Sequence, residues 1–238
     1  MNDNTGVFPE NHGDLAGSVL PADVPAAIQI AVKFRICGSL RFLSHAETVR
    51  LFQRACERAG IKTVYSHGFN PRPKLSLPLP RSVGVETDED LLCLRLHNLT
   101  FDIEDFKAKL SAQLPQGCEL LTIRVAKSKK SIQPCMAAYV LMVQGEYFDE
   151  KLKATIKHVL ASEKLVLKRR IDAEGTTRNV EVRGFINTIE VDRENVTVEC
   201  KISPAGTIRV DEILELLQLD HKMLAAPVRR TSVKWQEE

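Results

Sequence analysis

The chain has 238 residues and a formal net charge of +2, and 44% of its residues are hydrophobic. This composition predicts a globular protein with a sizeable core, and the length fits two small domains of about 100–150 residues each. No run reaches the roughly 18 apolar residues of a membrane-spanning helix, so we expect no membrane segment.

Residues 1–26 contain acids, glycine and proline but no basic start followed by a long apolar stretch. This pattern excludes a signal peptide, and we expect a disordered tail. The six cysteines form no Cys-x-x-Cys motif and have no histidine at zinc spacing. We therefore expect reduced, buried thiols, no metal and no cofactor, in a cytoplasmic protein.

Residues 27–126 show the pattern of one α/β unit. The alternating stretch Ile28–Ile36 predicts a strand. Ser44 followed by Glu47 predicts a capped helix, which Gly60 ends. A strand near 75–79, a strand at 91–96, a helix at 103–114 and a strand at 119–125 complete the order β-α-β-β-α-β, which is that of a ferredoxin-like fold.

A polar, basic segment at 127–134 predicts a linker. A similar order recurs in residues 135–238, with strands at 138–144, 195–202 and 228–235 and helices at 149–160 and 210–217. Two further stretches, 165–171 and 180–189, predict a three-stranded meander with 195–202. The sequence thus predicts an α+β protein with two tandem ferredoxin-like (split βαβ) domains and antiparallel sheets.

Positive charge is concentrated between Lys33 and Arg81, where ten Lys and Arg stand against two Asp and Glu. The local balance of +8 exceeds the net charge of the whole chain, so the remainder is acidic. Such asymmetry favours an anionic partner, above all a nucleic acid. The alternative is a solvated basic surface without a partner.

The first predicted helix carries its arginines on one face. Arg50, Arg54 and Arg58 are spaced by four residues and fall within an arc of about 80°, opposite Phe52 and Cys56. This spacing predicts a cationic stripe, although an ordinary solvated helix face has the same pattern.

The segment after this helix predicts a stiff loop. Pro71 and Pro73 keep it out of helices and central strands, and Gly68 permits a tight bend. Aromatic rings that stack on bases beside cations that meet phosphates are typical of single-stranded nucleic-acid binding. The alternative is that Tyr65 and Phe69 fill the core beneath the loop. The candidate nucleic-acid-binding residues are Arg41, Arg50, Arg54, Arg58, Tyr65, Phe69, Asn70, Arg72 and Lys74.

The run FLSHAETVRLFQRACERAG…YSHGFNPRPKLSLPLP resembles a radical SAM-linked protein family of unknown function, of the type called domain of unknown function 2344. The resemblance covers roughly residues 34–96 and implies a radical SAM protein as partner, but no activity. Arg72 stands where the family frequently has histidine, which argues against a metal or acid–base role there. The matching positions are Ser44, His45, Arg54, Tyr65, Ser66, Gly68, Phe69, Asn70, Pro71, Pro73 and Lys74.

His45 and His67 are the candidates for catalysis. If the helix start and the loop pack together, the two histidines face each other and offer general acid–base cleavage of RNA. A structural role is the usual one for such histidines. The acidic run at 86–90 offers ligands for a divalent cation, although such a run usually caps a loop before a strand. The chain lacks both the cysteine motif of a radical SAM cluster and a phosphate-cradling glycine motif.

The second domain has further basic residues, which either extend the basic surface or protect edge strands from aggregation. They are Lys168, Arg169, Arg170, Arg178 and Arg183.

These features favour a non-catalytic protein that binds RNA or a ribonucleoprotein, or presents a substrate, for a radical SAM enzyme. One alternative is an RNA endonuclease using His45 or His67, because tandem ferredoxin-like domains with a basic face resemble the CRISPR repeat-processing endoribonucleases. Another is a protein-binding adaptor for the radical SAM partner. The favoured interpretation requires the arginine stripe and the loop to point outward together.

Overall fold

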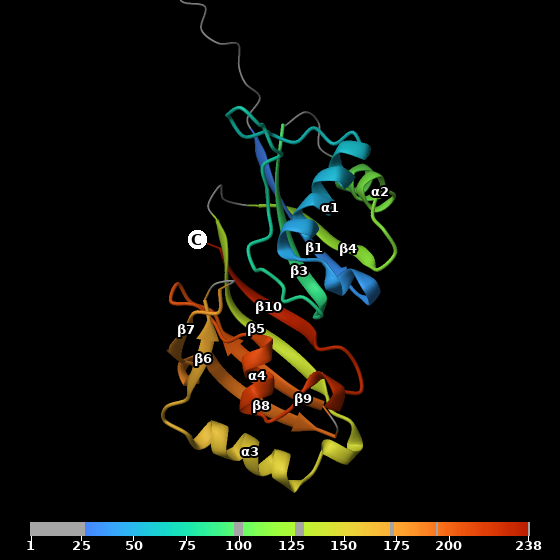
Figure 1. Ribbon diagram of the computed structural model, residues 1–238. Coiled ribbons are helices and arrows are strands. Elements are labelled where there is room, and N and C mark those ends of the chain that lie inside the picture. The colour runs from blue at the N-terminus through green and yellow to red at the C-terminus, as the bar shows by residue number, and fades with distance from the viewer. Residues whose placement is uncertain (1–26, 98–101, 127–130, 172–173, 194, 238) are drawn as a thin grey trace, which may run out of the picture.

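Figure 1 shows the computed structural model of the chain, which describes residues 27–97, 102–126, 131–171, 174–193 and 195–237. The predicted tail at 1–26 and residues 127–130 of the predicted linker lie outside the described residues. Residues 132–134 of that predicted linker belong to a strand. Among the described helices, none has the length and the apolar character needed to cross a bilayer.

The described part of the first half, residues 27–126, has four strands and two α-helices in the predicted order. They are β1 (Ile28–Ile36), α1 (His45–Arg58), β2 (Leu75–Ser76), β3 (Glu86–Leu96), α2 (Ile103–Ser111) and β4 (Cys118–Val125). A 3-10 helix, η1 (Gly38–Phe42), leads from β1 to α1. Gly60 follows α1 with a φ of 66°, a left-handed conformation that glycine adopts without strain.

The second half has the elements β5 (Ile132–Met142), α3 (Glu150–Ala161), β6 (Val166–Arg170), β7 (Thr177–Glu181), β8 (Ile186–Asp192), β9 (Asn195–Lys201), α4 (Val210–Leu216) and β10 (Arg229–Glu237). The predicted three-stranded meander is wrong, although its last two stretches do contribute the antiparallel pair β8 and β9. Strands β6 and β7 form a separate two-stranded sheet, and the 3-10 helix η3 (Arg183–Phe185) divides the predicted strand 180–189 between β7 and β8.

The two halves share one eight-stranded sheet (Figure 1). The strand order is β4-β1-β3-β10-β5-β9-β8, with β2 also paired to β3. Neighbouring strands are antiparallel except β3 and β10, which pair in parallel at the start of each strand. The α+β class and the mostly antiparallel sheet are therefore confirmed, whereas the sequence predicted a sheet for each half.

A buried ion pair lies where the halves meet. Arg230 of β10 is 1% exposed, and its Nε and Nη2 donate to Oδ1 of Asp90 on β3 at 2.9 and 2.6 Å. The guanidinium also donates to the carbonyl oxygens of Pro80 at 3.1 Å and Leu79 at 3.4 Å. Burial works to lower the pKa of Arg230, but Asp90 and Tyr139 together hold this pKa above its ordinary value. The pair therefore stays charged and joins β3, β10 and the segment after β2.

Each half has its own hydrophobic cluster between helices and sheet. In the first half, Ile30, Val32 and Phe34 alternate along β1 and belong to the same cluster as the buried residues of α1. The rings of Phe34 and Phe52 meet edge to face, with their centroids 4.8 Å apart. These contacts fix α1 on the sheet, so that its opposite face is left for other contacts.

All six cysteines are free thiols, and four of them are buried. Burial raises the pKa of Cys56, Cys118 and Cys200 to about 12 and that of Cys93 to about 11. The thiolate is the reactive form, so these four thiols are inert near neutral pH. The prediction of buried, hydrophobe-like cysteines is confirmed for these four.

Replacing Arg230 with leucine should lower the free energy of unfolding by about 3–5 kcal/mol, because Asp90 would be left as an uncompensated buried charge. Urea denaturation measures this loss. Lys109→Ala is the control, since its exposed pair with Asp105 in α2 should contribute only about 0.3–0.5 kcal/mol. Equal, small losses for the two variants would contradict a structural role for the buried pair.

In the native protein at pH 8, a disulfide reagent should titrate only the two half-buried thiols, Cys37 and Cys135. Thiols with a pKa near 12 contain almost no thiolate at that pH, and folded structure covers them. In guanidinium chloride all six thiols should react, because the unfolded chain removes the burial that raises the pKa. Rapid reaction of four or more thiols in the native state would show that the core opens readily.

Candidate nucleic-acid interface

Helix α1 begins with the predicted capping box. The hydroxyl of Ser44 accepts a hydrogen bond from the amide of Glu47 at 3.3 Å, and the carboxylate of Glu47 accepts from the amide of Ser44 at 2.8 Å. The bonds from Ser44 lower the pKa of Glu47. The motif residue Ser44 is therefore structural, and His45 follows it as the exposed first residue of the helix.

The two faces of α1 differ as the sequence predicted. Phe52, Ala55 and Cys56 are buried, whereas Arg50, Arg54 and Arg58 are exposed. We call these three arginines the arginine stripe. The stripe lines a groove of about 700 Å³ between α1, η1 and the residues that follow α2. The remaining lining residues are Leu40, Leu43, Glu47, Leu51, Ala112, Gln113, Leu114 and Pro115.

One arginine of the stripe is fixed by the protein itself. Arg58 donates from Nη2 to the carbonyl oxygen of Gln113 at 2.7 Å and from Nε to its side-chain oxygen at 3.2 Å. This contact ties the end of α1 to the chain after α2 and sets the width of the groove. The groove thus offers cations along one wall and leucine and proline side chains along the other, a combination that accepts an anionic group attached to an apolar one.

The predicted stiff loop forms a short hairpin, residues 64–74, at the end of the first half far from β10 (Figure 1). The amide of Ser66 donates to the carbonyl of Arg72 at 2.8 Å, and the amide of Lys74 donates to that of Val64 at 2.7 Å. The amide of Arg72 donates to the Ser66 hydroxyl at 3.0 Å. At the tip, Gly68 has a φ of 137°, which side chains disfavour. These bonds explain how a segment with two prolines keeps one shape.

The tip of the hairpin is fully open to solvent. Phe69 is 106% exposed and Tyr65 is 41% exposed, so the alternative in which both rings fill the core is wrong. Asn70 and Arg72 are also exposed, Lys74 is half-buried, and Pro73 is buried. The ring of Phe69 therefore contributes nothing to the core and is accessible to another molecule.

The stripe and the hairpin are separate surfaces. The groove contains the three arginines of the stripe but no residue of the hairpin, and Arg41 lies over the ring of Phe42, 4.3 Å from its centroid. The two histidines are also apart. His45 lies near Phe34, Leu79 and Asp90, whereas the hairpin with His67 is joined to the opposite end of β3 at Arg95. The expected meeting of His45 and His67 does not occur.

Part of the basic segment serves the fold. Arg81 is 8% exposed, and its Nη1 donates to the carbonyl oxygens of Arg41 at 2.7 Å and Val85 at 2.6 Å. Burial lowers the pKa of Arg81. Sequence reasoning counted Arg81 as surface charge and overlooked Arg230. No local signal marks either residue as buried, because each bonds to groups distant in the sequence, Arg81 to the carbonyl of Arg41 and Arg230 to the carboxylate of Asp90.

The acidic run at 86–90 is the first part of β3 and no loop. Glu89 accepts from Lys33 at 2.8 Å, and Asp88 lies 3.9 Å from Arg35 and 3.8 Å from Arg229. These carboxylates neutralise cations of the basic segment. Within the part of the chain that the structure describes, no group of His, Cys, Asp and Glu is arranged to hold a metal ion.

Two of the predicted basic residues of the second half are also structural. Arg169 binds Glu212 of α4 at 2.6 and 2.7 Å, and Arg183 donates to the carbonyl oxygens of Leu160 and Ser162 at the end of α3, both at 3.0 Å. The other three, Lys168, Arg170 and Arg178, are exposed on β6 and β7. The second half therefore adds less cationic surface than its sequence suggests.

Comparison with known proteins gives a family but no activity. Residues 29–214 match the family model described as an uncharacterized protein conserved in bacteria, DUF2344. No curated protein matches the sequence. Among solved structures, the chain is similar to a component of a crystal structure of a Cbf5-Nop10-Gar1 complex, with 12% identity and a TM-score of 0.43. The alignment covers 86% of this chain and 48% of that one, so the chain spans about half the length of that protein.

Proposed function

The chain belongs to the DUF2344 family of uncharacterized proteins conserved in bacteria, so its function has to be inferred from its surface. We propose that it is a non-catalytic protein that binds single-stranded RNA. The observation that carries this proposal is the fully exposed ring of Phe69, held at the tip of a hydrogen-bonded hairpin beside Tyr65 and Arg72. Rings of this kind stack on bases whatever their sequence, at about 1–3 kcal/mol per base.

The arginine stripe supports the same proposal. Three arginines one helical turn apart give an unbroken row of cations, and successive residues of such a row lie about 5–6 Å apart. A phosphate backbone bound along this row releases its counterions, which favours binding at low salt. The stripe and the hairpin are two contacts on one strand of RNA, one for phosphates and one for bases.

We propose that the scaffold consists of two ferredoxin-like units. The spatial order of strands supports this, because it is fourth, first, third, second in both halves: β4-β1-β3-β2 and β10-β5-β9-β8. All of these neighbours are antiparallel, as in a split βαβ unit. The hairpin of β6 and β7 is then an insertion in the second unit.

A radical SAM enzyme in the cytoplasm is the partner in this proposal. This step rests on the resemblance of the motif at residues 42–80 to radical SAM-linked proteins. The protein would hold the RNA and the partner would perform the chemistry. An RNA endonuclease is disfavoured, because His45 and His67 lie at opposite ends of the first half and form no acid–base pair.

A filter-binding titration of a single-stranded oligouridylate over a range of salt concentrations tests the proposal. Arg54→Ala should weaken binding and reduce the slope of log K against log salt by about 0.7, the value for one phosphate contact on a single strand. Phe69→Ala should weaken binding by about 1–3 kcal/mol and leave the slope unchanged, because a stacking contact releases no counterion.

The exposed Arg178→Ala in β7 removes the same charge from another part of the molecule and should leave binding unchanged. Phe69→Trp keeps an aromatic ring and should bind as the native protein does. RNA binding without salt dependence, or equal losses for Arg54→Ala and Arg178→Ala, would contradict the proposal. Displacement of the RNA by polyglutamate at equal charge would instead identify the surface as an adaptor for an acidic protein.

A further inference from the structure

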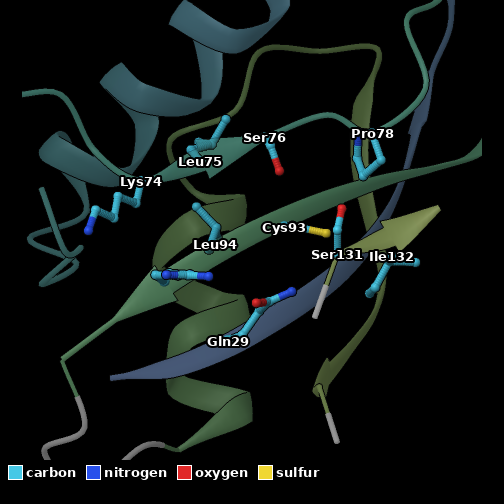
Figure 2. A pocket seen from close by; sticks show the side chains of 10 residues that line it. Gln29, Lys74, Leu75, Ser76, Pro78, Cys93, Leu94, Ser131 and Ile132 are labelled. Carbon is cyan, nitrogen blue, oxygen red and sulfur yellow. The ribbon is translucent and has the colours of Figure 1, made fainter. Parts of the chain in front are cut away.

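A pocket of about 290 Å³ lies on the face of the first half that the helices leave uncovered (Figure 2). Residues of β1 and β3 alternate between the two faces of the sheet, and Ile30 and Leu92 point toward the helices. Their neighbours Gln29 and Cys93 therefore belong to the other face, where both line the pocket. The pocket contains no residue of the arginine stripe, so it is a separate site.

Small side chains produce the hollow. Arg124, Ala31, Cys93 and Ser76 form one row across β4, β1, β3 and β2, because each is paired with the next in the strand register. Cys93 and Ser76, the two members of this row that line the pocket, have small side chains and leave space above the sheet. The start of β5 closes one side with Ile132, which is 4% exposed and belongs to one cluster with Ala31 and Cys93. Both halves of the molecule thus build the pocket.

The lining combines two cations with neutral polar groups and apolar walls. Lys74 and Arg95 are the cations, and the amide of Arg95 donates to the carbonyl of Lys74 at 3.0 Å, which holds the two residues side by side. The neutral polar groups are those of Gln29, Ser76 and Ser131, and the apolar walls are formed by Pro78 and Ile132. Figure 2 shows Ser76, Cys93 and Ser131 lining the same part of the pocket and the Lys74 side chain extending away from them.

This lining fits binding rather than covalent chemistry. Burial raises the pKa of Cys93 to about 11, so its thiol is neutral and a poor nucleophile near neutral pH. Arg and Lys side by side are a typical receptor for phosphate, and hydroxyl and amide groups hydrogen-bond the edges of bases or sugars. Apolar walls accept the flat faces of a base.

We propose that this pocket binds one nucleotide, with its phosphate between Lys74 and Arg95 and its base between the apolar walls. The site goes beyond the RNA-binding surface of the previous section and stands without it. The nucleotide has two possible sources, a free nucleoside monophosphate or one unit of a bound RNA. Lys74 ends the hairpin whose tip carries Phe69, so an RNA strand on that tip is near the opening.

The chain contains a single tryptophan, which reports on the pocket. Trp235 packs against the cluster of Ile132 and Cys93, two residues that line it. Titration of the native protein with each of the four 5′-nucleoside monophosphates, followed by tryptophan fluorescence and calorimetry, should give saturable binding for at least one of them. Inorganic phosphate alone should bind more weakly, because it leaves the apolar walls unused.

Variants locate the site. Arg95→Ala should weaken nucleotide binding about ten-fold or more, as loss of a charged hydrogen bond predicts. Ser76→Phe, on an exposed position of β2, should fill the pocket and abolish binding measured by calorimetry. Arg178→Ala should have no effect on nucleotide binding. If the pocket takes the free nucleotide, Arg95→Ala should also leave the salt slope of oligouridylate binding unchanged.

Competition identifies the source of the nucleotide. If the monophosphate displaces oligouridylate, the pocket holds a unit of RNA. If both bind together, the pocket takes the free nucleotide. Absence of binding for all four monophosphates overturns the proposal, as does binding that neither Arg95→Ala nor Ser76→Phe weakens. Failure of oligouridylate to bind, with nucleotide binding intact, would instead overturn the RNA-binding proposal alone.

Discussion

The arrangement of the molecule depends on the buried pair of Arg230 and Asp90. Strand β2 ends at Ser76, so it occupies only the far end of the free edge of β3, and β10 reaches the near end in parallel. The segment after β2 passes this junction, and Arg230 donates hydrogen bonds to its carbonyl oxygens at Leu79 and Pro80 as well as to Asp90. Unpaired buried carbonyls and carboxylates are costly, which makes this arginine the condition for one continuous sheet.

One consequence of the shared sheet is that the arginine stripe, the hairpin and the pocket are all held in place by the same sheet. Helix α1 is fixed through Phe52 against β1, and the hairpin at 64–74 is fixed through Lys74 and Arg95 to the end of β3. The pocket exists only because β5, from the second half, crosses beside the first-half sheet. A ligand that extends over several of these surfaces explains them more readily than three unrelated partners do.

Local patterns predicted the local structure well. Ser44 and Glu47 predicted the start of α1, and the spacing of Phe52 and Cys56 relative to Arg54 predicted which face of the helix is buried. Both signals lie within a few residues of the structure that they predict. The class of the fold and the order of elements in the first half followed from the same kind of signal. The exposed hairpin was foreseen as a stiff loop, since proline and glycine act through their own backbone.

Long-range partners were not predictable in this way. Nothing near Arg230 in the sequence indicates Asp90, which lies 140 residues away. The same holds for Arg169 with Glu212, so charges that looked free are in fact structural. The division of 180–189 by η3 depends on Arg183, whose acceptors are carbonyls at the end of α3. The pocket required the register of four strands, which a single sequence does not contain.

Ultraviolet cross-linking of the native protein to single-stranded RNA, followed by mass spectrometry of the peptides, tests the central claim most directly. Aromatic side chains stacked on bases cross-link efficiently, so the account predicts adducts on Phe69 or Tyr65 in the hairpin peptide. Tyr147, in the 3-10 helix η2 (Gly145–Tyr147) of the second half, is 37% exposed, close to the 41% of Tyr65, and should remain unmodified. Adducts confined to the second half, with none on the hairpin, would contradict the account.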